Sequence, residues 1–225
     1  IRSLTAKIRE LGIPYLSRLI TNGYLLDDAV IGEFEELGIR AVQVTVDGPR
    51  KIHDSRRPLS GGQGTFDRIV ENLQRLADGW NGWISIRVNI DKANADAYQV
   101  VRTFLKDRLP ADRARIYPGM VSPGNSASCG DIACPFDPAE EAAFYIAQYR
   151  DHGNQDLAFY PKLISSGLVH GSCMAHTQRS FVVGPTGDLF KCYHDLGVTE
   201  MRVGTVFGEE GWDQDLLARY MIGTD

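Results

Sequence analysis

The sequence predicts an α/β protein, and three observations lead to this fold class. Segments with the period of an amphipathic helix alternate with short segments rich in β-branched residues, which is typical of parallel strands joined by helical crossovers. Two of the predicted strands place apolar side chains on one face and polar side chains on the other. Between residues 122 and 138 the composition changes to Pro, Gly, Ser, Asn and Cys, which marks a domain boundary or a long loop.

The predicted elements follow one another in a regular order. Helices are expected at 1–11, 28–37, 65–79, 97–105 and 138–149, and strands at 17–21, 41–46, 83–90 and 115–121. Asp28 and Thr65 stand where helix caps are expected, and Gly12, Gly38 and Gly79 stand where three of the helices end. Strands that are separated by helices are expected to form a parallel sheet with right-handed crossover connections.

The alternation in strands 41–46 and 83–90 indicates what their two faces contact. Parallel strands that are buried on both sides usually read as continuous apolar runs, so here one face packs on helices and the other faces a polar space. An open sheet facing water is one explanation. A barrel with a wide, ligand-holding lumen is the better one, because crossover helices normally cover both sides of an open sheet. The polar positions are Gln43, Thr45 and Asp47 in the first strand and Ser85, Arg87 and Asn89 in the second.

Composition and charge exclude several classes of function. The formal net charge is −5, and basic residues are scattered apart from Arg50, Lys51, Arg56 and Arg57, so a nucleic-acid partner is not expected. Neither a membrane span nor a signal peptide is recognisable, and a cytoplasmic location is expected. Helical periodicity already begins at Ile1 and continues at 216–221, so the chain is expected to be an internal piece of a longer protein.

Four cysteines in a cytoplasmic protein are more often metal ligands or reactive thiols than disulfides. Cys173 and Cys192 bracket a predicted hairpin over 180–192, with the spacing Cys-x13-Gly-x4-Cys and Gly187 in the turn. Because a hairpin returns its second strand beside its first, the two sulfurs can converge on one metal centre.

A zinc ion or a four-iron cluster needs about four ligands, so two thiolates do not complete a site. The others could come from Cys129 and Cys134, from His176 or His194, from outside the chain or from a substrate. For Cys129 and Cys134, two unrelated buried cysteines are an equally good interpretation.

The spacing of Cys173, Gly187 and Cys192 is similar to the opening of the SPASM domain, the auxiliary-cluster extension of radical S-adenosylmethionine (SAM, AdoMet) enzymes. Upstream motifs resemble the third, fourth and fifth barrel strands of the same family, in the same order. They are Leu19-Ile20-Thr21-Asn22-Gly23 with Leu25-Leu26; Val44-Thr45-Val46-Asp47-Gly48-Pro49 with Ile52-His53-Asp54, Arg56-Arg57-Pro58 and Gly64-Thr65-Phe66-Asp67; and Ile86-Arg87-Val88-Asn89-Ile90 with Asn94. The resemblance runs from residue 1 to about residue 206.

This resemblance implies an α/β fold made of a partial (β/α) radical-SAM barrel, strands 3 to 6 with their helices, followed by the start of a cysteine-rich SPASM domain with a β-hairpin. The expected divisions are the partial barrel at 1–122, a connecting loop and helix at 123–165, and the SPASM part at 166–225.

The resemblance also implies that the polar strand face holds AdoMet. Thr45 would meet the amino-acid end of the cofactor, Arg87 and Asn89 would lie near its carboxylate or ribose, and Asn22 would shape the same wall. Asp47 and Arg57 complete the expected cofactor-binding set.

Simpler roles are open for several of these residues. Asn22-Gly23 and Asp47-Gly48 also suit simple turns. His53, Asp54 and Arg57 are expected in a loop, either as solvent-exposed charges or as contacts to substrate or cofactor.

The function implied for the parent protein is a peptide maturase, an oxidoreductase that modifies a ribosomally made peptide or protein through a 5′-deoxyadenosyl radical. Its 4Fe-4S clusters would be held in part by Cys173, Cys192, Cys129 and Cys134, and its electron donor would be a flavodoxin or ferredoxin. No catalytic residue is assigned. The alternatives are a non-catalytic peptide-binding protein and a structural zinc-binding α/β protein.

Two departures from the family pattern narrow this expectation. The family holds its first cluster with a Cys-x3-Cys-x2-Cys loop, and none of the four cysteines has that spacing, so the chain by itself is expected to be inactive. Tyr193 stands where sulfatase-maturing members carry an aspartate that acts as a base, which argues against that subgroup.

Overall fold

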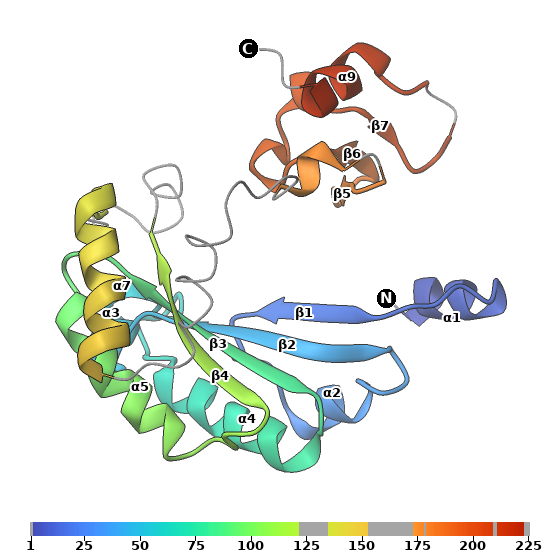
Figure 1. Cartoon of the computed structure of the whole chain (residues 1–225). Coiled ribbons are helices and arrows are strands. Elements are labelled where there is room, and N and C mark those ends of the chain that lie inside the picture. The colour runs from blue at the N-terminus through green and yellow to red at the C-terminus, as the bar shows by residue number, and fades with distance from the viewer. Residues whose placement is uncertain (1, 122–134, 153–172, 178, 209–210, 223–225) are drawn as a thin grey trace. The chain divides into compact units, whose positions relative to one another are not determined.

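The computed structural model describes residues 2–121, 135–152, 173–177, 179–208 and 211–222. The chain divides into two compact units, Ile1–Phe159 and Tyr160–Asp225. The first unit contains, in chain order, α1 (Arg2–Glu10), β1 (Ser17–Thr21), α2 (Asp28–Gly32), β2 (Ile39–Val46), α3 (Arg50–Arg56), α4 (Phe66–Gly79), β3 (Trp83–Ile90), the 3₁₀ turn η1 (Ala95–Ala97), α5 (Tyr98–Lys106), β4 (Ala114–Met120) and α7 (Pro138–His152) (Figure 1).

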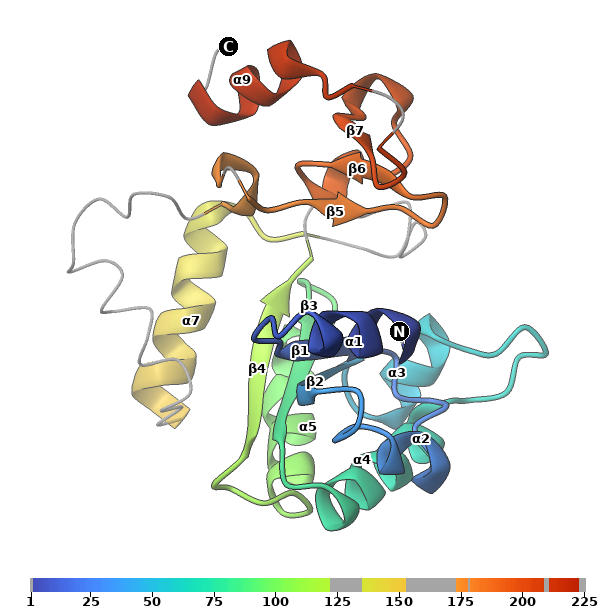
Figure 2. The ribbon, with the colours of Figure 1, turned by 90° about the vertical axis from the view of Figure 1, so that its right-hand side faces the viewer.

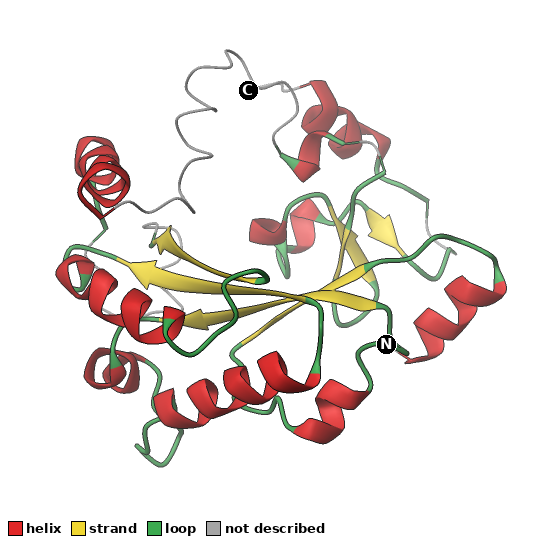
Figure 3. Cartoon of the chain, turned by 60° about the horizontal axis from the view of Figure 1, so that its bottom comes forward, coloured by secondary structure: helices red, strands yellow, loops and turns green. Residues whose placement is uncertain are grey.

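The first unit is built on a four-stranded parallel sheet in the order β1-β2-β3-β4. Helices α2, α4 and α5 lie against one face of this sheet (Figure 3). The core forms there, because every second residue of β2 and β3 meets the apolar stripes of the helices. It includes Val42, Val44, Val46, Ile84, Ile86, Val88 and Ile90 from the strands and Phe66, Ile69, Leu73, Leu76, Val101 and Leu105 from α4 and α5.

The predicted α/β class with parallel strands is confirmed, and the strand bounds 17–21 and 83–90 are those of β1 and β3. Two details of the second helix differ from the prediction. Its N-cap is Asp27, whose side chain accepts a hydrogen bond from the Val30 amide, and Asp28 is its first residue. The regular α-helix ends at Gly32, before the predicted end near Leu37.

The prediction of a loop at His53 and Asp54 is wrong, because both belong to helix α3. This helix has seven residues and begins after Pro49, which favours a helix start because its φ is fixed near the helical value. It escaped prediction because its buried residue is a histidine, so no apolar period marks it.

Helix α7 contacts the start of α5, and in Figure 2 it stands on the β4 side of the first unit. The ring centroids of Tyr98 and Phe144 are 5.7 Å apart, and Lys92 pairs with Glu140 at 2.7 Å. These contacts join α7 to the start of α5 and to the loop after β3. Residues 122–134, which precede α7 in the sequence, lie outside the described residues.

The second unit contains η5 (Met174–His176), β5 (Val182–Val183), β6 (Asp188–Phe190), η6 (Tyr193–Asp195), η7 (Thr199–Met201), β7 (Gly204–Thr205) and α9 (Gln214–Ile222). Strands β5 and β6 form the predicted hairpin, and Gly187, with φ 88°, adopts the left-handed conformation that its turn requires. The third strand, β7, was not predicted. The buried core is small and consists of Leu189, Val203 and Leu216.

Three arginines of the basic run form ion pairs with carboxylates. Arg50 pairs with Asp67, Arg56 with Asp91 at 2.9 Å, and Arg57 with Asp47 at 2.6 Å. Among the described helices, none has the length and apolar content needed to cross a membrane.

Candidate functional site

The face of the sheet opposite the helices carries the polar residues of β2, β3 and β4. Parallel register places Thr45 beside Arg87 and Arg87 beside Tyr117, with Asn89 beside Gly119. All of these side chains except the glycine are half-buried, which agrees with the predicted alternation. Polar groups on a half-buried face are available to bind a ligand that has several hydrogen-bonding groups.

Arg87 is held in place on this face. Its Nε donates to Asn89 Oδ1 at 3.0 Å, and its Nη2 donates to the Met120 carbonyl at 3.3 Å. The side chain passes directly over Gly119, where a Cβ atom would overlap Arg87 Nε. The glycine thus makes room for the guanidinium, a group that can bind a carboxylate through two parallel hydrogen bonds.

A second pair on the same face joins β2 and β4, the two strands that flank β3. Tyr117 donates its hydroxyl hydrogen to Gln43 Oε1 at 2.8 Å, across β3. This contact was not predicted, because the sequence does not reveal that position 43 and position 117 share a face two strands apart.

The loops after β1 and β2 bring together the other predicted cofactor residues. Asn22 and Arg57 both line a pocket of about 230 Å³, whose wall is completed by Tyr24, Leu25, Pro58, Leu59, Thr65 and Ile69. Arg57 Nε donates to Asp47 Oδ2 at 2.6 Å, and Asp47 is only 4% exposed. Its other carboxylate oxygen, Oδ1, is buried without a hydrogen-bond partner among the described residues.

The predicted turn at Asn22 is present, and after Asp47 the chain bends at Gly48. Asn22 is exposed, and its Oδ1 accepts a hydrogen bond from the Tyr24 amide at 3.0 Å, while Gly23 has φ 80°. Gly48 follows Asp47 with φ 132°. The turn role of Asn22 is therefore established by local geometry, and it leaves Asn22 able to line the pocket as well.

His53 is fully buried and connects the end of β2 to the start of α4. Its Nδ1 accepts a hydrogen bond from the Asp47 amide at 3.2 Å, and its Nε2 lies 3.1 Å from Thr65 Oγ1. Thr65 Oγ1 in turn donates to the Arg57 carbonyl at 2.7 Å. Because Nδ1 is an acceptor, the ring is neutral with its proton on Nε2. Burial lowers the pKa of His53 below its ordinary value of 6.5, against the opposing charge of Asp47.

The side chain that caps helix α4 is Asp54. Thr65 occupies the predicted N-cap position, but its own side chain does not cap the helix. Asp54 Oδ1 accepts hydrogen bonds from the amides of Thr65 and Phe66 at 2.8 and 2.9 Å. The Thr65 hydroxyl makes no capping bond, since it is used by His53 and Arg57. A carboxylate at a helix N-terminus also interacts favourably with the helix dipole.

Two buried asparagines hold the loops at the strand ends. Asn94 Nδ2 donates to the carbonyls of Asp47 and Asn89 at 2.8 and 2.9 Å, which ties β2 to β3. Asn72 Nδ2 donates to the carbonyls of Gly23 and Tyr24, both at 2.9 Å. Asn72 could have been found from the sequence, since it is a polar residue inside the apolar stripe of α4.

The six predicted cofactor residues thus fall into two groups within the first unit. Thr45, Arg87 and Asn89 lie on the polar sheet face, and Asn22, Asp47 and Arg57 lie in the loops after β1 and β2. The bond from Asn94 to the Asp47 and Asn89 carbonyls links the two groups.

Two of the four predicted metal ligands are described, and both are free thiols in the second unit. Cys173 is exposed and Cys192 is half-buried. Each precedes a 3₁₀ turn, η5 after Cys173 and η6 after Cys192. Cys129 and Cys134 lie outside the described residues. Among the residues that are described, no group of three or more metal-binding side chains is present.

Around the cysteines, Lys191 and Tyr220 are the buried or partly buried polar groups. Lys191 is fully buried, and burial lowers the pKa of its ammonium group. Tyr220 donates its hydroxyl hydrogen to Asp195, and burial together with this bond raises the tyrosine pKa. Tyr193, at the position that distinguishes the sulfatase-maturing subgroup, is 63% exposed and contacts the His194 ring, with 4.3 Å between centroids.

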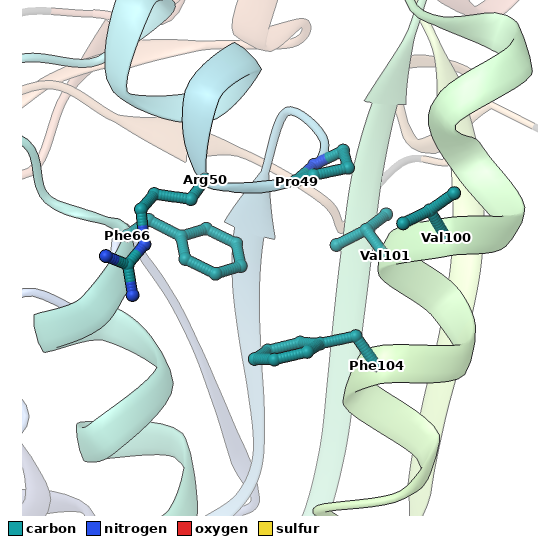
Figure 4. Close-up of a pocket in the computed structure, with 6 residues that line it drawn as sticks. All are labelled: Pro49, Arg50, Phe66, Val100, Val101 and Phe104. Carbon is teal, nitrogen blue, oxygen red and sulfur yellow. The ribbon is translucent and has the colours of Figure 1, made fainter.

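A second pocket lies on the helical side of the first unit (Figure 4). It has a volume of about 210 Å³ and is lined by Pro49, Arg50, Phe66, Val100, Val101 and Phe104. Phe66 and Phe104 face one another across it with 5.8 Å between centroids. Its walls are mainly apolar, and it contains none of the predicted cofactor residues.

No protein-family model and no curated protein sequence matches the chain. Several solved structures share its fold. The chain matches anSMEcpe with bound AdoMet at a TM-score of 0.72 and 18% identity, over 98% of this chain and 62% of that one. The complex of anSMEcpe with AdoMet and the Cp18Cys peptide gives a TM-score of 0.70 at 18% identity, with the same coverage of 98% and 62%.

SuiB from Streptococcus suis matches at a TM-score of 0.66 and 16% identity, over 98% of this chain and 54% of that one. The chain therefore spans 54 to 62% of the length of these structures. The sequence resemblance to radical SAM/SPASM enzymes is supported at the level of fold: nearly the whole chain has the fold of the matching part of these solved structures.

Proposed function

We propose that this chain is part of a radical SAM/SPASM oxidoreductase that modifies a ribosomally made peptide or protein. The observation that carries the proposal is the half-buried row of Thr45, Arg87 and Asn89, on the polar sheet face of a chain whose fold matches an AdoMet-bound enzyme. In this proposal β1 to β4 are strands 3 to 6 of a (β/α) barrel, and 166–225 begins a SPASM domain after a connection at 123–165.

The polar face suits the amino-acid end of AdoMet. Arg87 offers a guanidinium for the carboxylate, already oriented by Asn89 and the Met120 carbonyl. Thr45 and Asn89 offer a hydroxyl and an amide for amino and hydroxyl groups. The buried, unpartnered Asp47 Oδ1 is a further acceptor beside these strand ends.

In the second unit, Cys173 and Cys192 fit part of an iron-sulfur site. Thiolates are the usual ligands of four-iron clusters, and a hairpin separates these two. Cys129 and Cys134 are proposed as further ligands. When bound, a reduced four-iron cluster together with AdoMet would supply the hydrogen-abstracting chemistry, and the residues of this chain would bind and orient the cofactor and the peptide.

Partners are proposed on the same basis. The anSMEcpe structure with Cp18Cys supports a peptide substrate, and an electron donor such as flavodoxin or ferredoxin would reduce the clusters. Since no Cys-x3-Cys-x2-Cys loop occurs within residues 1–225, we propose that this chain alone does not cleave AdoMet.

The first test uses the protein that contains this chain, reconstituted anaerobically with iron and sulfide. Iron, acid-labile sulfide and zinc are quantified, and 5′-deoxyadenosine is measured after AdoMet is added under reducing conditions. We expect iron and sulfide in cluster stoichiometry together with 5′-deoxyadenosine. Zinc without sulfide would instead support a structural zinc protein, and clusters without 5′-deoxyadenosine would support a peptide-binding protein.

The second test concerns the polar face. Arg87→Met should weaken AdoMet binding by about tenfold to a hundredfold, because a charge-assisted hydrogen bond contributes about 1.5–3 kcal/mol. Arg68→Met is the matched control, since Arg68 is an exposed arginine on the outer surface of α4. Equal AdoMet dissociation constants for both variants, measured by equilibrium dialysis, would contradict the proposed binding face.

A further inference from the structure

Lys191 places a cation in the interior of the second unit. Its side chain is 0% exposed, and its Nζ donates to the carbonyls of Thr177 and Ser180 at 2.6 and 2.8 Å. Nζ also lies 4.7 Å from the centroid of the Phe181 ring. All three partners are neutral. Burial of a charge is unfavourable unless hydrogen bonds or an opposite charge compensate it, so the two carbonyl bonds are what keep this ammonium group in the interior.

The partners of Lys191 belong to the segment that leaves Cys173. The Cys173 carbonyl accepts a hydrogen bond from the His176 amide at 3.2 Å, which closes η5, and Thr177 follows this turn directly. The ammonium group of Lys191 therefore binds the backbone at Thr177, the residue that directly follows the turn begun by Cys173.

The second cysteine has the same backbone setting. Cys192 follows Lys191 directly, and its carbonyl accepts a hydrogen bond from the Asp195 amide at 3.2 Å, which closes η6. Both cysteines have extended backbone conformations at the N-terminus of a 3₁₀ turn. Lys191 thus connects two parts of the chain. Its side chain hydrogen-bonds to the segment that follows η5, and its backbone leads directly into Cys192, the residue before η6.

Helix α9 provides a second connection between the same two turns. It packs against η5, and its Tyr220 donates a hydrogen bond to Asp195 of η6. The two cysteine turns are thus held from one side by a helix and from the interior by Lys191.

We infer that Lys191 is a positioning residue that holds Cys173 and Cys192 together as one preformed thiol pair. The inference deepens the proposed function, in which these thiols bind an iron-sulfur cluster. Its physical basis is preorganisation: when two ligands are fixed before the metal arrives, binding does not have to order the second one.

The experiment measures the proximity of the thiols directly, without a metal. The test uses residues 1–225, in which a Cys129→Ser/Cys134→Ser background leaves Cys173 and Cys192 as the remaining cysteines. Dibromobimane becomes fluorescent when it joins two neighbouring thiols. Lys191→Met should slow this cross-linking by about tenfold or more, since the gain from holding two groups together is lost. Lys191→Arg, which keeps a cation and its donors, should recover most of the rate.

The controls separate positioning from folding and from thiol reactivity. Arg219→Met removes an exposed cation from α9 in the same unit and should leave the rate unchanged. Labelling by monobromobimane reports the reactivity of each thiol alone, and circular dichroism reports folding. If Lys191→Met does not fold, Lys191→Gln is read in its place. Equal cross-linking in the folded Lys191 variant, or no cross-linking in the parent background, would overturn the inference.

A cobalt titration distinguishes this inference from the proposed function. Co²⁺ bound by thiolates gives a charge-transfer absorption, which should weaken in Lys191→Met and disappear in Cys192→Ser. Lys191-dependent cross-linking without binding of Co²⁺ or of iron and sulfide would support the positioning role and contradict the cluster proposal. Thiolate binding of Co²⁺ with Lys191-independent cross-linking would contradict the positioning role alone.

Discussion

At the scale of single residues, His53 shows how a polar side chain can be a core residue. The two ring nitrogens of the neutral, buried imidazole form hydrogen bonds with the Asp47 amide and the Thr65 hydroxyl, and the Thr65 hydroxyl also bonds to the Arg57 carbonyl. A buried group in such a network is costly to leave without partners, so its protonation state matters for stability.

The stability of the first unit should therefore decrease in acid through His53. Burial lowers the His53 pKa in the folded state, so between that pKa and 6.5 the unfolded chain binds more protons than the folded one. The contribution of His53 to the free energy of unfolding is complete above pH 6.5 and is lost as the pH falls below this value. Urea unfolding at a series of pH values should show this loss, and His53→Phe should lack it. His194→Phe, at an exposed position, should keep it.

Arg87 and Gly119 form a pair in which one residue makes room for the other. Gly119→Ala should lower the free energy of unfolding by about 1–3 kcal/mol, because its Cβ overlaps the Arg87 side chain. In an Arg87→Ala background the same change should cost much less. A double-mutant cycle measured by urea denaturation gives this coupling directly. Additive costs would show that the two side chains do not compete for the space.

At the scale of elements, the loop between β2 and α4 is organised by contacts that reach across it. Asp54 of α3 caps α4, His53 of α3 binds Thr65, and Arg57 after α3 binds Asp47 after β2. Isolated helices of this length are marginal in water, so α3 is stabilised mainly by the hydrogen bonds that its side chains make to the start of α4.

Asp54→Ala should destabilise the first unit by about 0.5–2 kcal/mol, the usual cost of losing an N-terminal helix cap. Asp67→Ala is the matched control, because Asp67 is an acidic residue in the first turn of the same helix and is 63% exposed. Its effect should stay within about 0.5 kcal/mol. Similar losses for both variants in urea unfolding would indicate that general charge, and not the cap, stabilises α4.

At the scale of the whole molecule, the two units differ in how they are stabilised. The first unit has a continuous core between sheet and helices, while the described residues of the second include five buried apolar side chains, of which Leu189, Val203 and Leu216 form its core cluster. Small units with little core commonly depend on a metal or on disulfides. The proposed cluster site would serve this purpose in the second unit.

A thiophilic ion should therefore stabilise the second unit selectively. At about 100 times its dissociation constant, Cd²⁺ should add about 2.7 kcal/mol to the second unit and nothing to the first. Hydrogen exchange checks this: the amides of β6 and α9 should become more protected with Cd²⁺, while those of β3 should not. Cys192→Ser should abolish the difference. Equal protection with and without Cd²⁺ would argue against a metal site in this unit.

The sequence by itself determined the elements whose pattern repeats. The parallel strands, the polar and apolar faces of β2 and β3, the apolar stripe of α4 and the hairpin with Gly187 all follow from local periodicity and turn chemistry. The ordered motifs also led to the resemblance to radical SAM/SPASM enzymes, and the chain shares the fold of part of AdoMet-bound anSMEcpe.

Only the tertiary structure decided which polar residues meet. Asp54 caps a helix 12 positions away, Asn72 holds carbonyls 48 and 49 positions away, and Lys191 bonds to carbonyls 11 and 14 positions away. No periodicity encodes such contacts, because a hydrogen bond depends on distance and direction in space and not on separation along the chain. For the same reason the sequence placed His53 in a loop, whereas the fold makes it part of the core.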